Sequence, residues 1–406
     1  MNILFACHRF PYPPNRGGKI RPFNMIRHLS QSHRVTVATV AHSKEEAESG
    51  APLHQHCAEV IYEVVPSSTR WIKAAAALPL SAPSSVRYFH SSKVIRQVVD
   101  SSRRQPFDCV IVHCAFAAQF VEGVTASFRM MDFGDLDSGK WFEYAQERSF
   151  PMSAAYWLEA KKLRRYELEL ARRFDLCTFT APGELDQFRA IAPGVKSELI
   201  SNGVDSTYFR LRVPRQERPP VIGFLGRMDY FPNVKGAIWF AKSVFPSIQK
   251  RVPKAVFRII GSNPIASIKA LTSNPGIEVT GSVPDVRDLM NDVAVSVVPL
   301  TLARGTQNKI LECMGMGVPV VCTPEAAKGV NAKVDRDFLV ASSAEEFTNA
   351  VIRIFEDKQL EQTLASNARN QVEAGHNWSA SMAKLDGLLP ASVPGHSSEM
   401  TSRSGR

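Results

Sequence analysis

The sequence lacks the features that carry a protein into or across a membrane. Its longest bland apolar stretch runs from Ala74 to Leu80, far short of the roughly 20 apolar residues that span a bilayer. At the N-terminus, His8 and Arg9 interrupt the chain before an apolar run of signal-peptide length forms. These absences argue against a secreted or membrane-spanning protein, so we expect it in the cytoplasm.

Cysteine is scarce, and its spacing excludes the common zinc and redox motifs. The seven cysteines are odd in number and include no Cys-x-x-Cys pair. Most of them stand within apolar runs. The pattern predicts buried, reduced thiols rather than a disulfide framework.

Basic residues outnumber acidic residues, and this excess indicates anionic partners. The chain has 49 Lys and Arg against 39 Asp and Glu, a formal net charge of +10. Phosphorylated small molecules, nucleic acid and an acidic membrane face would all suit this charge. Nucleic acid has no further support, because neither zinc-finger spacing nor the aromatic pattern of RNA-binding sheets is present. We expect no nucleic-acid partner.

Short β-branched runs alternate with amphipathic helical stretches along the chain. The expected strands of the first half are Asn2–Cys7, Val35–Val40, Val60–Val65, Cys109–His113, Phe128–Asp132, Leu176–Thr180 and Ser197–Ile200. Those of the second half are Val221–Leu225, Val256–Ile260, Ile277–Thr280, Val293–Val298 and Val318–Cys322. The expected helices include Lys19–Leu29, Val234–Lys250, Lys309–Met316 and Ala344–Phe355. This alternation predicts an α/β fold with parallel sheets covered on both faces.

The length of 406 residues suits two domains. We expect an N-terminal domain over residues 1–200 and a C-terminal domain over residues 221–375. Residues 201–220, with Asn-Gly, charged clusters and prolines, are expected to link them. Residues 376–389 are expected to form a C-terminal helix that packs back on the N-terminal domain, and residues 390–406 have the composition of a disordered tail.

One expected helix, residues 154–174, is unusually basic. Its six cations are Lys161, Lys162, Arg164, Arg165, Arg172 and Arg173. A basic amphipathic helix can make a peripheral contact with an anionic membrane. The alternative is an ordinary helix with one solvated face, favoured by Glu159, Glu167 and Glu169, which dilute the charge. Both interpretations stay open.

Three loops that follow expected strands carry candidate binding residues, because open parallel sheets bind ligands at the carboxyl ends of their strands. In the first loop, Gly17 and Gly18 precede a helix whose free amides would attract an anion. The loop has neither the G-x-G-x-x-G pattern of dinucleotide sites nor that of a P-loop. A plain turn explains it about as well.

The second loop follows Val221–Leu225 and contains Arg227 and Lys235. The planar fork of an arginine and the point charge of a lysine could both reach a diphosphate. Alternatively, Arg227 pairs with a surface carboxylate. The position of Arg227 directly after a strand and a glycine favours the binding role.

The third loop leads into the expected helix Lys309–Met316. Its polar residues are Gly305, Thr306, Gln307 and Asn308. The start of the helix would present free amides and a positive dipole to an anion, at about 0.3–2 kcal/mol per contact. Lys309 adds a full charge, and Glu312 could accept hydrogen bonds from ribose hydroxyls.

This third loop, with Ser201–Asp205 and Gly226-Arg227, resembles the family-4 glycosyltransferases of GT-B fold. The stretch KILECM at 309–314 and the stretch GVPVV at 317–321 look like their donor-binding helix and the strand that follows. The resemblance extends over about residues 1–385.

The N-terminal half carries a narrower resemblance. The stretches RFPYPP at 9–14 and MDFGDLDS at 131–138 are similar to bacterial sugar transferases of exopolysaccharide gene clusters, including those found with PEP-CTERM/exosortase systems. This similarity implies a role in exopolysaccharide synthesis.

The resemblance implies two Rossmann-like domains whose parallel sheets face each other across a cleft. The C-terminal domain would hold a nucleotide-diphosphate-sugar donor and the N-terminal domain a saccharide or lipid-linked acceptor. Arg227 and a lysine would neutralise the leaving diphosphate, Glu312 would contact the ribose, and Gly261 and Val283 would lie near the base. The resemblance also implies transfer with retention of configuration, without a metal or other cofactor.

Two departures from the family pattern affect these roles. The first Glu of the Glu-x7-Glu pattern, which contacts the sugar, is replaced by Arg304. The interval from Arg227 to Lys235 is longer than usual, so we expect Lys309 to bind the diphosphate in place of Lys235.

The acceptor hydroxyl also needs a group that orients or deprotonates it. His113 and Asp132 end expected strands of the N-terminal domain and would face the cleft, although packing or capping explains them equally well. Asp135 and Asp137 precede a helix that begins near Ser138, where capping is the stronger explanation.

Two other functions remain as alternatives to transfer. A nucleotide-sugar epimerase of GT-B type would convert the donor without an acceptor. A non-catalytic sugar-nucleotide-binding protein would fit the loss of the first Glu.

Overall fold

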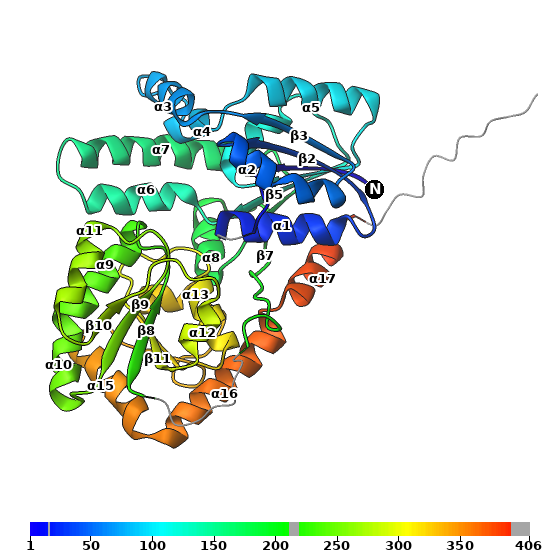
Figure 1. Cartoon of the computed structure of the whole chain (residues 1–406). Coiled ribbons are helices and arrows are strands. Elements are labelled where there is room, and N and C mark those ends of the chain that lie inside the picture. Colours follow the sequence, from blue (N-terminus) through cyan, green and yellow to red (C-terminus); the bar gives the residue numbers. More distant parts are fainter. Residues whose placement is uncertain (15–16, 211–218, 391–406) are drawn as a thin grey trace, which may run out of the picture.

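The computed structural model describes residues 1–14, 17–210 and 219–390. Figure 1 shows two α/β domains, each built on one sheet with helices around it. Both sheets are parallel throughout. The predicted fold class is therefore confirmed.

The N-terminal sheet has the strand order β3-β2-β1-β4-β5-β6-β7 and the C-terminal sheet the order β10-β9-β8-β11-β12-β13. The N-terminal strands are β1 (Asn2–Cys7), β2 (Arg34–Ala41), β3 (Glu59–Val64), β4 (Cys109–His113), β5 (Phe128–Gly134), β6 (Leu176–Phe179) and β7 (Ser197–Leu199). The C-terminal strands are β8 (Val221–Leu225), β9 (Val256–Ile260), β10 (Ile277–Val279), β11 (Val293–Val298), β12 (Val320–Cys322) and β13 (Leu339–Val340). Central strands such as β4, β8 and β11 are buried at every residue, which their aliphatic runs allow.

Helices cover both faces of each sheet (Figure 1). Those of the N-terminal domain are α1 (Gly17–Leu29), α2 (Lys44–Ser49), α3 (Ser67–Ala76), α4 (Ser84–Tyr88), α5 (Ser92–Arg104), α6 (Asp137–Gln146), α7 (Met152–Ala171) and α8 (Pro182–Ile191). Those that follow are α9 (Phe231–Trp239), α10 (Phe245–Arg251), α11 (Ala266–Lys269), α12 (Val286–Met290), α13 (Asn308–Gly315), α14 (Pro324–Ala327), α15 (Ala344–Glu356), α16 (Lys358–Gly375) and α17 (Trp378–Leu388). Short 3-10 turns occur at Ala51–Gln55, Ala115–Val121 and Ala270–Ser273.

The strand order determines where a ligand can bind. In each sheet the order reverses beside the first strand, between β1 and β4 and between β8 and β11. Loops leave in opposite directions at such a reversal and open a crevice at the carboxyl ends of the strands. The two crevices of this chain border one cavity between the domains.

Two expected elements differ in detail from the structure, and one short strand was not expected. The expected helix Val234–Lys250 is interrupted by a π-helical stretch, Phe240–Val244, before Pro246, whose missing N–H cannot continue the hydrogen-bond ladder. The strand expected from Val318 begins at Val320, after Pro319. The two-residue strand β13 was not predicted, because so short a segment has no periodicity.

Helix α7 corresponds to the basic helix expected at 154–174. Its Leu163 and Leu170 belong to the core of the N-terminal domain. Glu167 is buried, and Glu159 is buried where it accepts hydrogen bonds from the first amides of α4. This inner face is therefore occupied by the protein itself. No helix in the described residues is long and apolar enough to cross a bilayer.

Helix α17 returns to the N-terminal domain and lies beneath α1 (Figure 1). Met382 and Leu385 are buried in the same core cluster as β1, and His28 of α1 contacts Asp386 at 2.9 Å. Part of the expected linker, 211–218, and all but the first residue of the expected tail, 391–406, lie outside the described residues.

Candidate active site

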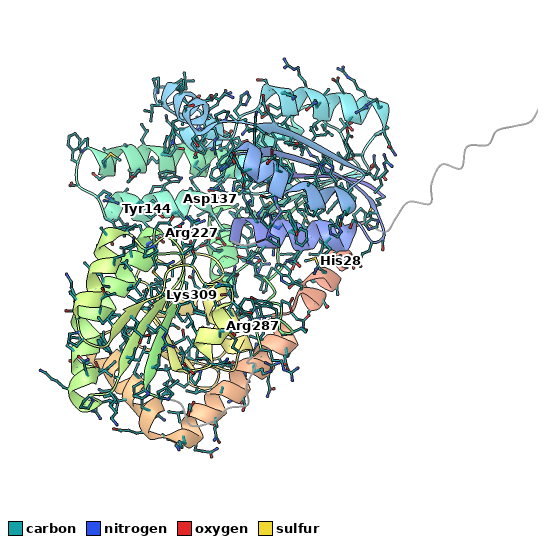
Figure 2. The ribbon with its side chains drawn as sticks, viewed as in Figure 1. His28, Asp137, Tyr144, Arg227, Arg287 and Lys309 are labelled. Atoms are coloured by element: carbon teal, nitrogen blue, oxygen red, sulfur yellow. The ribbon has the colours of Figure 1, made fainter. Side chains whose placement is uncertain are left out.

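A cavity of about 590 Å³ lies between the two domains. In Figure 2, Asp137 of the N-terminal domain and Arg227 and Lys309 of the C-terminal domain lie near this boundary. The N-terminal lining includes His8, Arg9, Gly17, Gly18, Arg21, His113, Cys114, Asp135, Asp137, Lys140 and Thr180. The C-terminal lining includes Arg227, Asp229, Asn233, Arg304, Thr306, Gln307, Asn308 and Lys309. The C-terminal lining carries several cations beside a helix start, which suits an anion.

Lys309 stands in the first turn of α13. Its Nζ donates a hydrogen bond to Oδ1 of Asn233, whose Nδ2 donates to the carbonyl oxygen of Arg227 at 2.9 Å. The ammonium also lies 5.2 Å from the centre of the Phe224 ring. Burial lowers the pKa of Lys309 to about 8, against the opposing effect of Glu312. An anion in the cavity would restore the charge that burial disfavours.

Two helix starts from different domains border the cavity. Gln307 precedes α13 without capping it through its side chain. The start of α1 faces Asn308, because a Cβ at Gly17 would lie 3.8 Å from the Nδ2 of Asn308. Both helix dipoles direct their positive ends toward the same space.

Arg227 lies at the carboxyl end of β8, with its side chain 46% exposed. It forms a two-pronged contact with Asp229, in which Nε lies 3.1 Å from Oδ1. The hydrogen bond from Arg227 lowers the pKa of Asp229. The carboxylate that the sequence analysis named as an alternative partner of Arg227 is thus present, and both members of the pair line the cavity.

On the N-terminal side, Asp132 is fully buried and holds His113. Its Oδ2 lies 2.7 Å from Nδ1 of His113, while Arg21 donates to both carboxylate oxygens and Thr178 donates to Oδ1. Burial would raise the pKa of Asp132, but Arg21 and His113 hold it well below its ordinary value. With Nδ1 donating to the carboxylate, Nε2 of His113 keeps the lone pair that a general base needs.

The capping expected of Asp135 and Asp137 is wrong. Helix α6 has Leu136 as its N-cap, without a side-chain cap. The amide of Ser138 instead donates to the buried Glu167 at 3.0 Å. Both aspartates approach Lys140, at 3.7 and 3.0 Å, and these carboxylates hold its pKa well above the ordinary value although burial would lower it. Nowhere in the described residues do three or more His, Cys, Asp or Glu gather in a way that could hold a metal ion.

Arg304 joins the two domains. Its Nε lies 2.6 Å from Oε1 of Glu143 on α6, and its Nη1 lies 3.1 Å from Oε1 of Glu184 on α8. Gly139 is necessary for this approach, since a Cβ there would lie 2.4 Å from the guanidinium. The next residue, Gly305, has φ +61° and contacts Asp135 so closely that any side chain would clash with the carboxylate. The third loop thus contacts the N-terminal domain directly.

Arg304→Ala should loosen the contact between the domains. The substitution removes an interdomain arginine whose side chain is 16% exposed, and it leaves Glu143 and Glu184 without their cationic partner. The contact between the domains should therefore lose about 2 kcal/mol or more of free energy. Small-angle X-ray scattering of the ligand-free protein should show a larger radius of gyration. Lys235→Ala, which breaks a more exposed interdomain pair, is the control and should leave the curve unchanged. Superimposable curves for wild type and Arg304→Ala would contradict this account.

A second cavity of about 870 Å³ lies beside the first and contains Glu312. It is bounded by α1, by residues 203–209 and by Val286 of α12, and Asn308 lines both cavities. Burial raises the pKa of Glu312 to about 7, against the influence of Lys309. Lys309 and Glu312 thus face neighbouring spaces from one turn of α13.

The other predicted residues divide into two groups. Gly17, Gly18, Thr306, Gln307 and Asn308 line the first cavity. Lys235, Gly261 and Val283 line neither of the two cavities. Lys235 instead lies 2.6 Å from Glu147. Gly261 packs so closely on Gly226 that a Cβ on Gly261 would lie 1.7 Å from the carbonyl oxygen of Gly226. Val283 packs against the C-terminal core.

Several cavity residues were not predicted. They include Asn233, Arg21 and His8, whose places in the cavity result from the tertiary fold. The sequence offered one signal for them, which is that His8 directly follows the strand β1. His8 is 8% exposed, its ring centre lies 6.2 Å from that of His113, and its Nδ1 has no hydrogen-bond partner in the described part of the chain. Burial, then the charge of Arg9, lowers the pKa of His8 well below its ordinary value, so it is neutral at pH 7.

Residues 219–357, about a third of the chain, match the family described as Glycosyl transferases group 1. The match covers the part of the C-terminal domain that contains Arg227, Lys309 and Glu312. A search of curated proteins finds no match in sequence.

Solved structures similar to the whole chain have the same two-domain fold. Sucrose-phosphate synthase from Thermosynechococcus elongatus is 16% identical, with a TM-score of 0.71 over 95% of this chain and 97% of that one. The Anabaena protein HepE in complex with UDP and glucose is 16% identical, with a TM-score of 0.65 over 95% and 98%. WaaG, a glycosyltransferase involved in lipopolysaccharide biosynthesis, is 15% identical, with a TM-score of 0.67 over 96% and 100%. The chain therefore has the GT-B fold.

Proposed function

We propose that the protein is a hexosyltransferase of family-4 type that moves a sugar from a nucleotide-diphosphate-sugar donor to a hydroxyl acceptor. The observation that carries the proposal is a pair of cations, Lys309 at the start of α13 and Arg227 just after β8, that line one cavity between two GT-B domains. Asn233 accepts a hydrogen bond from Lys309 and donates one to the backbone carbonyl of Arg227. The match to Glycosyl transferases group 1 covers these residues.

The donor extends through both cavities in this proposal. Its diphosphate binds Lys309, Arg227 and the amides at the start of α13. Its ribose reaches Glu312, so the nucleoside enters the second cavity. That the similar Anabaena protein was solved in complex with UDP and glucose supports a nucleotide-sugar donor.

The chemistry requires positive charge where the leaving group forms. As the bond between the anomeric carbon and the diphosphate oxygen breaks, negative charge grows on the diphosphate, and preorganised cations stabilise it. Lys309, Arg227 and the helix start supply this charge, so we propose that no metal cofactor is needed. From the N-terminal domain, Nε2 of His113 accepts the proton of the attacking hydroxyl while Asp132 fixes the tautomer. We propose attack from the face of the departing diphosphate, which retains the anomeric configuration.

The acceptor in this proposal is a saccharide or lipid-linked saccharide of exopolysaccharide synthesis, reached at the inner face of the cell membrane. Its support is the resemblance of residues 9–14 and 131–138 to exopolysaccharide sugar transferases.

A donor screen tests the proposed function. UDP-, GDP- and dTDP-sugars are incubated with the protein, with and without a membrane extract as the source of acceptor, and release of nucleoside diphosphate is followed. We expect one donor class to give release that the extract stimulates and a chelator does not stop. Release that is independent of acceptor, or no release from any donor, would contradict transfer.

One observation favours a second function, donor binding without turnover. Arg304 occupies the position of the sugar-contacting Glu and is engaged by Glu143 and Glu184. A binding protein would take up one nucleotide sugar and return it unchanged in the screen.

The affinity for a nucleoside diphosphate should fall at high pH. Lys309, whose pKa is about 8, is charged below that pH, and bound diphosphate would raise this pKa further. The affinity is therefore full below about pH 8 and falls above it, by at most about tenfold per pH unit. Calorimetry from pH 7 to higher pH measures it. Lys309→Arg should remove the dependence and Lys235→Arg should keep it, whereas an equal slope in Lys309→Arg would exclude Lys309 as the titrating group.

A further inference from the structure

An exposed apolar surface lies at α3, at the outer edge of the N-terminal domain and away from the C-terminal domain (Figure 1). Trp71 and Ile72 on the helix are 66% and 69% exposed, and Leu78 and Leu80 just after it are 57% and 52% exposed. We define these four side chains as the α3 surface. Large apolar side chains gathered in this way mark a site of contact with a protein or a membrane.

The stretch of sequence that contains the α3 surface is basic. From Val64 to Val99 it has no Asp or Glu. Over the same stretch it has five cations, Arg70, Lys73, Arg87, Lys93 and Arg96. Apolar side chains that could enter the acyl region, with cations beside them, are complementary to an anionic bilayer.

The nearest cations have no carboxylate partner in the described part of the chain. Lys73 donates to the carbonyl oxygen of His90 at 2.9 Å, and Lys162 of α7 donates to the carbonyl oxygen of Leu78 at 2.8 Å. Arg70 of α3 is itself buried, with its guanidinium 4.8 Å from the centre of the Tyr88 ring. Its Nε and Nη1 have no hydrogen-bond partner among the described residues. Positive charge therefore remains at this surface.

A row of ring contacts connects the α3 surface with the first cavity. Each ring centre lies 5.0–6.2 Å from the next. In order from the surface the rings are Trp71, Tyr88, Phe89, Phe116, His8 and His113. The row ends at the histidine to which we assign the acceptor proton. The α3 surface is thus continuous, through packed rings, with the acceptor side of the cavity.

We infer that the α3 surface docks on an anionic phospholipid bilayer and brings the acceptor side of the cavity to a lipid-linked saccharide. The identity of the acceptor in this inference rests on the proposed function. The docking on the bilayer does not depend on that function. It differs from the contact expected of the basic helix, because α7 buries its Leu163 and Leu170 in the core.

Vesicle sedimentation tests the docking. The full chain is mixed with vesicles of phosphatidylcholine alone or with added phosphatidylglycerol. We expect sedimentation with the anionic vesicles that weakens as salt is added, and little with the neutral ones. Trp71→Ser/Ile72→Ser should lower the partition coefficient by at least about tenfold, because two apolar side chains no longer enter the bilayer.

The matched control is Trp157→Ser/Leu158→Ser on α7, whose side chains are 47% and 46% exposed. It should bind like wild type, and a larger loss in this variant than in the α3 variant would overturn the inference. Equal binding of the wild-type protein to both vesicle types, or no binding to either, would also overturn the inference. If the surface instead joins two copies of the chain, ultracentrifugation without vesicles would show a dimer that the α3 variant breaks, which also overturns it.

Two readouts separate docking from catalysis. Nucleoside diphosphate affinity without vesicles should be the same in wild type and both double variants, which shows that they are folded. If vesicles bind but no donor is turned over, the proposed function fails and the docking stands. If a donor is turned over but vesicles do not bind, the docking fails and the proposed function stands.

Discussion

Replacing Lys309 by alanine should lower kcat/KM for sugar transfer by about 10²–10³-fold, the effect of removing one preorganised group that stabilises developing charge, about 2.7–4 kcal/mol. Lys309 is the cation set directly at the start of α13 and fixed there by Asn233. The loss should appear mainly in kcat, because the charge on the diphosphate grows as the bond to the sugar breaks. Steady-state kinetics with the donor found in the screen measure it.

Lys235→Ala is the matched control for this prediction. Lys235 was the other lysine that the sequence analysis considered for the diphosphate, and the structure pairs it with Glu147 outside the cavity. We expect less than about a threefold change in kcat/KM, within the range of surface substitutions. If the two variants lost activity equally, or if Lys309→Ala retained full activity, the leaving-group role of Lys309 would be wrong.

Replacing Asp132 by alanine should destabilise the N-terminal domain by about 3–5 kcal/mol, because it leaves the guanidinium of Arg21 buried without its counter-charge. Thr178 and His113 lose a hydrogen-bond acceptor at the same time. Denaturant titration read by hydrogen exchange in peptides of β5 and β6 measures the change.

The double variant Arg21→Met/Asp132→Leu tests the physical reason. Without either charge, no ion is left buried alone, so the double variant should lose less stability than the sum of the single variants. Additive losses would show that the ion pair is not the cause. The pKa of Asp132 is lowered in the folded state, so its contribution is present above the unfolded pKa of about 3.9 and is lost as the pH falls below it. The difference between wild type and Asp132→Ala should therefore narrow in acid.

The sequence was sufficient to predict the architecture because parallel strands buried on both faces leave uninterrupted aliphatic runs. The runs at 109–113, 221–225 and 293–298 coincide with β4, β8 and β11. The carboxyl ends of such strands also predicted a place for a ligand, and Arg227, Lys309 and His113 do line one cavity there.

The partners of these residues could not be predicted, because each comes from a distant element. Nothing near Arg304 in sequence indicates that Glu143 and Glu184 will meet it across the domain boundary. Likewise, Gly261 had the position of a ligand-binding glycine, but its missing side chain serves the close approach to Gly226. Contacts of this kind depend on tertiary packing, which local sequence patterns do not reveal.

The most direct test of the central claim follows both products of one reaction. A donor labelled in its sugar is incubated with the protein and its acceptor. The released nucleoside diphosphate and the labelled acceptor are then quantified in the same reaction. The wild-type protein is compared with the Arg227→Ala and Lys309→Ala variants. We expect equal amounts of the two products from the wild-type protein, and a collapse of both in the variants. Donor that binds but is recovered intact, or is converted to another nucleotide sugar with no labelled acceptor, would contradict it.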